Sequence, residues 1–167
     1  MYGLGDMVFY SSTGVCEIVG VGAVEGMPAG KEFYTLCPVS TSHREMIYVP
    51  VDIQKGLRRA ISGEEANNFI EMIKTIEPVA PTSRNPKAIS DFYSRLISTY
   101  DCKNLLTVIV SLTLKKRECE EKKKRLNQTQ ASFLYKACEM IYNEFALALN
   151  ISKQEVEALI ARQMDNF

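Results

Sequence analysis

Apolar and polar residues alternate along the N-terminal part of the chain. In residues 7–21, MVFYSSTGVCEIVGV, two apolar runs flank the stretch Ser11–Gly14, which predicts two short strands. A glycine-rich loop follows at residues 22–30. The segments KEFYTLCPV and REMIYVPV are rich in Tyr, Phe, Val and Ile, and they predict two more strands separated by the polar turn STSH.

Four or five short strands within 50 residues are too few for a large sandwich. The compact solution is a small, strongly bent sheet or a Tudor/SH3-like barrel. Pro38 and Pro50 should lie at strand ends or edges, because proline cannot donate to a ladder. An edge strand can accept a strand from a partner, and residues 44–50 are the best candidate because they alternate and end in proline.

From residue 62 onward the apolar positions recur every three or four residues, which predicts helices. Ser62 and Glu65 fit a capping box at the start of the first helix. Residues 77–86 contain three prolines and form the natural linker. Asn85 followed by Pro86 predicts an N-cap and a first helical residue. The apolar stripe of that helix is Ile89, Phe92, Tyr93, Leu96, Ile97 and Tyr100.

The remaining helices are predicted from similar signals. Residues 105–114 suit a strand or a buried helix on their own, and their helical neighbours favour the helix. Residues 115–125 fit either its solvated continuation or a loop. Residues 130–149 give the clearest helical pattern, with Asn150 as a left-handed end residue. Ser152 begins a last short helix.

These patterns predict an α+β fold with a small N-terminal Tudor/SH3-like β-barrel and an all-α C-terminal domain. We expect the β module at residues 1–60, a connecting helix at 61–78 and the helical domain at 79–167. The longest apolar stretch, Leu105 to Leu114, is too short to span a bilayer. No secretory signal is visible at the N-terminus, so we expect a cytoplasmic protein.

Signals for catalysis, metals or cofactors are nearly absent. The five cysteines form no CxxC pair and there is one histidine, so we expect reduced thiols and no metal site. The motifs G-x-S-x-G, Walker A and H-E-x-x-H are missing. GVGAVEG is superficially similar to a nucleotide-binding loop, but it sits between strands instead of opening a helix. We expect no enzyme, no cofactor and no small-molecule substrate.

The zero net charge of the chain hides an asymmetry. Residues 1–78 hold six Lys/Arg and ten Asp/Glu, a difference of −4, whereas residues 79–167 hold fourteen and ten, a difference of +4. Within residues 82–136 the balance is twelve against five, or +7. An acidic front and a basic middle suggest two partners, one of them a polyanion.

Two basic segments are candidates for nucleic-acid contact. The first is Lys115–Arg125, which reads either as a phosphate-binding cluster or as a solvated helix face with the ion pairs Glu118–Lys122 and Glu120–Lys124. The second is residues 83–95, which is either a phosphate-binding helix start or simply a capped helix after a linker. The candidate DNA contacts are Arg84, Asn85, Pro86, Lys87, Lys122, Lys123, Lys124 and Arg125.

The segments LGDMVFYSSTGVCEI, KEFYTL and IYVP, in this order, resemble the N-terminal module of the CarD/CdnL family of bacterial transcription regulators, which transcription-repair coupling factor shares. FYSRLISTYD and LNQTQASFLYKACEMIYNEFALAL are similar to helices of the family's C-terminal domain. The resemblance implies a Tudor-like module that docks on the β subunit of bacterial RNA polymerase by strand addition. It also implies a helical domain that contacts promoter DNA and stabilises the open complex. The residues expected at the polymerase are Arg44, Met46, Ile47, Tyr48, Val49 and Val24.

The chain departs from the family pattern at several positions. The family usually has a tryptophan wedge at the start of the first C-terminal helix, but this chain has no Trp and Asn85 stands at that place. Ala131 stands where a basic DNA-contacting residue is common. Val24 and Tyr48 stand where some members have arginines. The expected function is therefore a regulator that binds polymerase and promoter DNA with an altered DNA contact; the alternative is an adaptor of the same fold that does not engage DNA.

Overall fold

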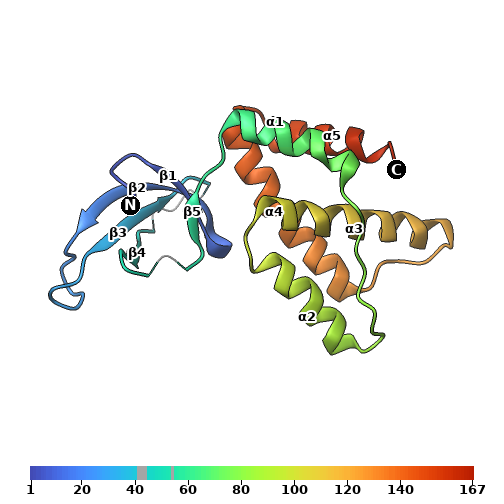
Figure 1. Ribbon diagram of the computed structural model, residues 1–167, viewed down its shortest axis with the longest axis horizontal. Helices are drawn as coiled ribbons and strands as arrows, with labels where there is room; N and C mark the ends of the chain where they lie inside the picture. Colours follow the sequence, from blue (N-terminus) through green and yellow to red (C-terminus); the bar gives the residue numbers. More distant parts are fainter. Residues whose placement is uncertain (41–44, 54) are drawn as a thin grey trace. The chain divides into compact units, whose positions relative to one another are not determined.

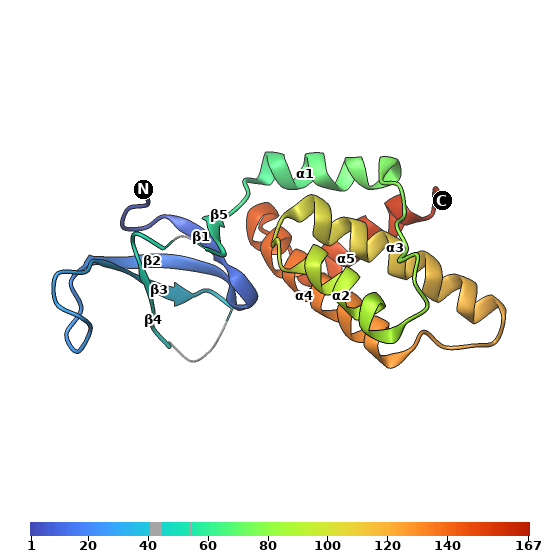
Figure 2. The same ribbon diagram turned by 60° about the horizontal axis from the view of Figure 1, so that its bottom comes forward.

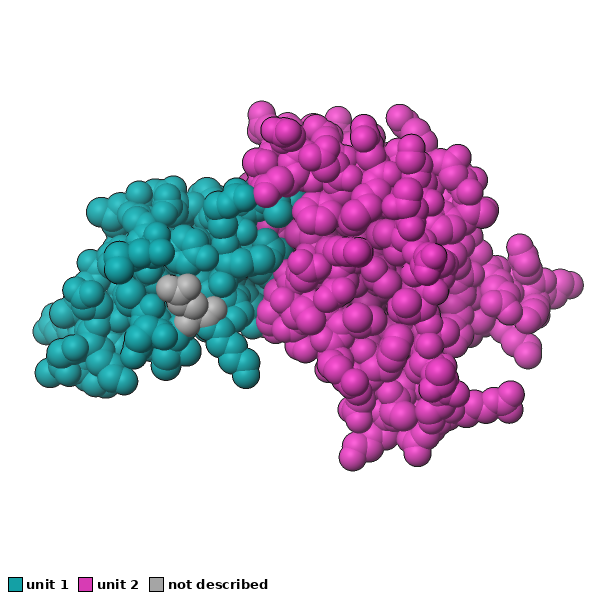
Figure 3. All heavy atoms as spheres, in the orientation of Figure 1, with its two compact units in different colours: residues 1–61 teal, residues 62–167 magenta. Residues whose placement is uncertain are grey.

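The computed structural model describes residues 1–40, 45–53 and 55–167. The chain divides into two compact units, which are coloured separately in Figure 3: unit 1 is Met1–Ile61 and unit 2 is Ser62–Phe167. Strands occupy unit 1 and α-helices occupy unit 2. The α+β class predicted from the sequence is confirmed. The expected domain boundaries stay predictions.

Unit 1 is a five-stranded antiparallel sheet that curls into a half-barrel (Figure 1). The chain turns from the first strand into the second at Gly14, whose φ of 88° suits glycine. The strand order is β4-β3-β2-β1-β5, so β4 and β5 form the two edges. The strands are β1 (Met7–Tyr10), β2 (Gly14–Gly22), β3 (Phe33–Pro38), β4 (Ile47–Pro50) and β5 (Leu57–Arg59).

Alternate residues of these strands build the core of unit 1, as the period of two requires. Pro38 and Pro50 are the last residues of β3 and β4, so the predicted placement of both prolines at strand ends is confirmed. The core residues are Val8, Cys16, Ile18, Tyr34, Leu36, Val49 and Leu57.

Unit 2 contains five α-helices and one short 3-10 helix among its residues, all of which the structure describes. The capping boxes at Ser62 and Ser152 are present, Asn85 caps its helix, and Asn150 has the left-handed φ of 53°. All four predicted helix-end residues are thus confirmed. The elements are α1 (Gly63–Met72), η2 (Ile73–Thr75), α2 (Pro86–Ile97), α3 (Cys102–Glu121), α4 (Gln128–Leu149) and α5 (Lys153–Met164).

The long helix α3 lies in the core of unit 2. Residues 105–114 are helical, and seven of them are buried on nearly every side of the helix, which explains the continuous apolar run. Helix α4 supplies Ala137, Ile141 and Phe145 to the same core. Helix α1 packs on α4 through Phe69 and Phe145, whose ring centroids lie 6.3 Å apart. No helix in the described part of the chain is long and apolar enough to cross a bilayer.

Candidate interaction surfaces

The backbone of β4 is paired on one side by β3, in an antiparallel register that places Tyr48 opposite Thr35. The N–H of Val51 donates to the carbonyl oxygen of Glu32 over 3.0 Å, so these two residues form a hydrogen-bonded pair. In an antiparallel ladder such pairs alternate with non-bonded ones. Ile47 and Val49 therefore direct their backbone groups toward β3, and Tyr48 directs its own outward.

Tyr48 is the strand residue of β4 with both backbone groups available on the outer side. The backbone of Pro50 also faces outward, and proline is accepted there because no neighbouring strand needs its N–H. Its carbonyl oxygen already accepts the N–H of Ile53 over 3.1 Å in the following turn. None of the described residues hydrogen-bonds to the N–H or C=O of Tyr48. An added strand would thus find one donor and one acceptor at Tyr48.

The side chains expected at the polymerase lie in different environments. Met46 and Tyr48 are 43% and 39% exposed. Val49 is 3% exposed, so its side chain packs in the core beneath β4 and is not available to a partner. Val24 is half-buried in the loop between β2 and β3. Ile47 packs partly against the core, and Arg44 lies outside the described residues.

The opposite edge of the sheet offers less. Strand β5 has three residues. The N–H of Ser11 donates to the carbonyl oxygen of Gly56, so Phe9 and Arg58, two positions further on, also form a hydrogen-bonded pair. The backbone groups of Arg59, which lies between such pairs, therefore point away from β1. The carbonyl oxygen of Arg59 accepts a hydrogen bond from Nη1 of Arg58 over 3.2 Å. The β5 edge is therefore partly covered by its own side chain, and β4 is the more open edge.

At the start of α2 the Asn85 side chain serves the helix itself. Its Oδ1 accepts the N–H groups of Lys87 and Ala88 at 2.9 and 3.4 Å. The backbone N–H of Asn85 donates to Oγ of Ser83 over 3.1 Å. Arg84, Pro86 and Lys87 are exposed around this cap. Asn85 is thereby held in place, and the cations beside it remain open to solvent.

The second basic segment begins where α3 ends. Lys122 Nζ lies 2.9 Å from Glu118 Oε1, and this hydrogen bond raises the pKa of Lys122 and lowers the pKa of Glu118. Lys123 has a φ of 55°, and the N–H of Lys124 closes the helix end by donating to the carbonyl oxygen of Cys119 over 2.7 Å. Lys123, Lys124 and Arg125 are exposed.

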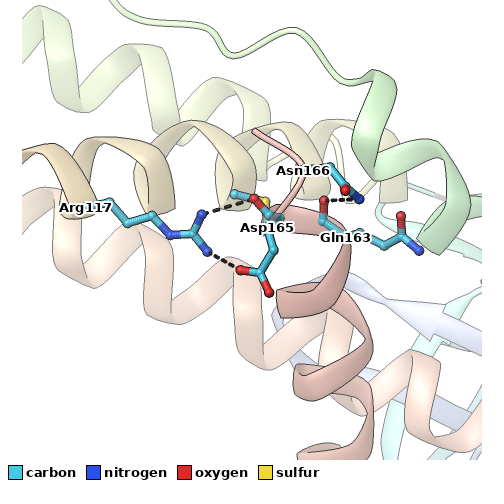
Figure 4. Close-up of polar contacts among 5 residues, drawn as sticks. Arg117, Gln163, Asp165 and Asn166 are labelled. Carbon is cyan, nitrogen blue, oxygen red and sulfur yellow. Dashed lines mark hydrogen bonds and ion pairs between the residues drawn. The ribbon is translucent and has the colours of Figure 1, made fainter.

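Arg117 of the same basic run is directed elsewhere. Its Nη1 donates to the carbonyl oxygen of Met164 over 3.1 Å, and its Nη2 lies 3.6 Å from Asp165 Oδ1. Figure 4 shows the guanidinium reaching from α3 to the end of α5, where Asn166 also bonds to Gln163. Arg117 therefore ties two helices together.

Helix α3 runs opposite to α2 and α4 within unit 2, as Figures 1 and 2 both show. The end of α3 and the starts of α2 and α4 consequently lie at one end of the unit. This arrangement brings the two candidate basic segments, residues 84–87 and 122–125, to the same end. The N–H ends of α2 and α4 add to the positive potential there, and the carbonyl end of α3 opposes it in part.

The outward phase of Tyr48 was not predicted from the sequence, although one signal was available. Proline fits only an outward phase on an edge strand, so Pro50 alone indicates that Tyr48 faces the same way. A groove between α3 and α4 was also missed, because its lining residues are far apart in sequence.

The described residues contain no group of three His, Cys, Asp or Glu side chains that could hold a metal ion. The five cysteines are free thiols. Burial, with a smaller contribution from Cys37, raises the pKa of Cys16 to about 11, which makes it a poor nucleophile.

Comparison with protein families gives a match to the CarD-like/TRCF RID domain over residues 2–61. The matched segment is unit 1 without its first residue, so unit 2 lies outside it. No curated protein matches the chain. The resemblance predicted from the strand segments is confirmed for this part. Residues 2–61 form a CarD-like/TRCF RID domain, which is a non-catalytic interaction module of transcription-related proteins that bind RNA polymerase.

Proposed function

We propose that this protein is a bacterial transcription regulator that docks on the β subunit of RNA polymerase through unit 1 and contacts promoter DNA through unit 2. Docking occurs by addition of a polymerase strand to β4. The DNA contact changes the stability of the open complex. The protein acts in the cytoplasm and has no catalytic role.

The observation that carries the docking proposal is the open β4 edge of a CarD-like/TRCF RID domain. Tyr48 offers a donor and an acceptor to an incoming strand, and the exposed Met46 and Tyr48 side chains flank that line. Backbone hydrogen bonds supply affinity in strand addition, while exposed alternate side chains supply specificity.

The charge distribution supports the DNA contact. Residues 82–136 have a balance of +7, and their two exposed basic segments lie at one end of unit 2. Lysine and arginine neutralise phosphates without reading the bases, so such contacts position a protein on a duplex and depend strongly on salt. The wedge that a tryptophan would supply is missing, and Asn85 is engaged in capping.

The test measures binding of the full chain to purified polymerase core, to upstream-fork promoter DNA and to both together, over a salt series. We expect binding to polymerase alone, and a further gain with DNA at low salt. Lack of polymerase binding would refute the docking proposal. Polymerase binding with no gain from DNA would refute the DNA contact.

A second candidate function is an adaptor that binds polymerase or another protein and does not engage DNA. The absence of tryptophan and the capping role of the Asn85 side chain favour it. Equal binding to polymerase with and without DNA at every salt concentration is the result expected for an adaptor.

A further inference from the structure

A groove of about 480 Å³ lies between the second half of α3 and the first half of α4. Its apolar lining comes from Leu126, Ala131, Leu134 and Cys138. Cavities of 300–1,000 Å³ with a mostly apolar lining and a few polar groups are typical of small-molecule sites. The groove lies outside the CarD-like/TRCF RID domain.

The helical period explains why these residues meet. Lys116 and Glu120 lie four residues apart, so they share one face of α3, and Lys124 and Arg125 follow in the turn after its end at Glu121. Ala131, Leu134 and Cys138 share the facing stripe of α4. From Ala131 to Cys138, α4 rises about 10 Å, which sets the length of the apolar wall. One wall is charged and the other is apolar.

The charges of the groove are mainly positive. Lys116, Lys124 and Arg125 line it, against the single carboxylate of Glu120. Within the part of the chain that the structure describes, Lys124 and Arg125 have no ion pair, whereas the neighbouring Lys122 is paired with Glu118. Two long cationic side chains at the rim can therefore turn toward an anion without breaking an existing ion pair.

The apolar wall stays neutral and offers an aromatic surface. Burial raises the pKa of the Cys138 thiol, so no thiolate opposes an anion there. Tyr135 lines the same groove and is 67% exposed, so most of its ring is open to a ligand. An apolar or aromatic body can lie against Leu134 and Tyr135 while its charged group reaches the rim.

We propose that this groove binds a small amphipathic anion, namely a carboxylate, sulfonate or phosphate monoester attached to an apolar or aromatic body. The size favours a small molecule, because a groove two helical turns long is short for a protein partner, which usually covers about 800 Å² on each side. The proposal does not depend on polymerase or DNA binding. It does place an anion on Lys124 and Arg125, which are also candidate DNA contacts.

The test uses the full chain and the fluorescent probe 1-anilinonaphthalene-8-sulfonate, with uncharged N-phenyl-1-naphthylamine as its matched control. We expect saturable binding of one sulfonate probe and clearly weaker binding of the neutral one. Lys124→Gln with Arg125→Gln should weaken the sulfonate probe about tenfold. Lys123→Gln, an adjacent cation outside the groove, should leave its affinity unchanged.

Ala131→Trp tests the apolar half of the site, because Ala131 is an exposed lining residue that a larger side chain can fill. We expect loss of probe binding with an unchanged circular dichroism spectrum. Decanoate should displace the probe. Equal affinity of both probes, unchanged binding in Ala131→Trp, or displacement by an acidic Glu-Leu peptide at lower concentration than decanoate would each overturn the proposal.

Discussion

Val51 donates its backbone N–H to the carbonyl oxygen of Glu32 over 3.0 Å, and this bond fixes the phase of the whole β3–β4 ladder. The backbone groups of Val49 and Ile47 point toward β3, as those of Val51 do, while the backbone groups of Tyr48 point away from it. Neighbouring residues of one edge strand thus have different roles. One bonds within the sheet, and the next is free to bond with a partner.

Tyr48→Pro should therefore weaken polymerase binding while the protein stays folded. The substitution removes the outward N–H and leaves the β3–β4 bonds intact. We expect a loss of about 5- to 150-fold in affinity, since a missing donor leaves a partner carbonyl unsatisfied at a cost of about 1–3 kcal/mol. The measurement is a binding titration with polymerase core, supported by thermal unfolding of the free variant.

Two control variants separate the backbone from the side chain and from folding. Tyr48→Ala keeps the N–H, so it should retain most of the affinity. Ile47→Pro removes an N–H that faces β3, so it should lower the unfolding free energy by about 1–3 kcal/mol. Wild-type affinity in Tyr48→Pro would show that the partner does not add a strand at β4.

Replacement of Lys122, Lys123, Lys124 and Arg125 by alanine should weaken binding to promoter DNA. For every phosphate that is no longer neutralised, the slope of log K against log salt should fall by about 0.9. The measurement is fluorescence anisotropy over a salt series. Arg117→Gln is the matched control: it removes a charge from the same basic run, but that charge is engaged with the end of α5. An unchanged slope in the fourfold variant would mean that the cluster is only a solvated face.

Variants of Asn85 should distinguish capping from DNA contact. Asn85→Ala removes the acceptor for Lys87 and Ala88 and should destabilise the protein by about 1 kcal/mol in urea unfolding. Asn85→Asp keeps an acceptor and adds a negative charge beside Arg84 and Lys87. We expect near-normal stability and weaker DNA binding for Asn85→Asp. A drop in DNA affinity for Asn85→Ala at equal folded fraction would instead indicate a direct amide contact.

Helix ends were predictable from the sequence because their hydrogen bonds are local. The Ser62 hydroxyl accepts the N–H of Glu65 three residues on, and the same holds for Ser152 and Glu155. The information for such a cap lies within four residues. The placement of Ile47–Pro50 at an edge of the sheet was predictable for a similar reason, since alternation and a terminal proline are both local signals, while strand addition at this edge stays a prediction.

Features that depend on packing were not predictable in the same way. The groove requires Lys116 and Cys138 to meet, and these residues approach only because α3 and α4 pack against each other. The buried side chains of Gln130 and Glu144 likewise lie on a helix whose pattern alone suggested an apolar stripe. The sequence did not show how far α3 continues beyond residue 114, because its end is set by the left-handed backbone conformation of Lys123.

Gln130 provides a test of stability in the core of unit 2. Its side chain is 2% exposed, and Nε2 has no hydrogen-bond partner among the described residues. A buried donor without a partner costs about 1–3 kcal/mol. Gln130→Met has a similar shape and no such donor, so it should raise the unfolding free energy by about 1 kcal/mol in urea titration. Gln130→Glu buries a carboxyl group instead and should lower it.

Gly63 lies where α1 approaches the end of α4. Its replacement by alanine should lower stability, although helix propensity alone would favour alanine. A Cβ atom at this position would lie 2.9 Å from the carbonyl oxygen of Ala148, which is backbone and cannot turn away. Gly63→Ala should therefore destabilise the protein by about 1–3 kcal/mol, although alanine favours helices more than glycine does. The measurement is the urea midpoint at constant m-value.

Asn67→Ala is the matched control for Gly63→Ala, because Asn67 lies on the exposed face of the same helix. Alanine at that position should raise stability by a few tenths of a kcal/mol through propensity alone. Opposite signs for the two variants would show that α1 is held tightly on α4. A stabilising Gly63→Ala would mean that α1 can shift away from Ala148, and that the contact between Phe69 and Phe145 does not fix its position.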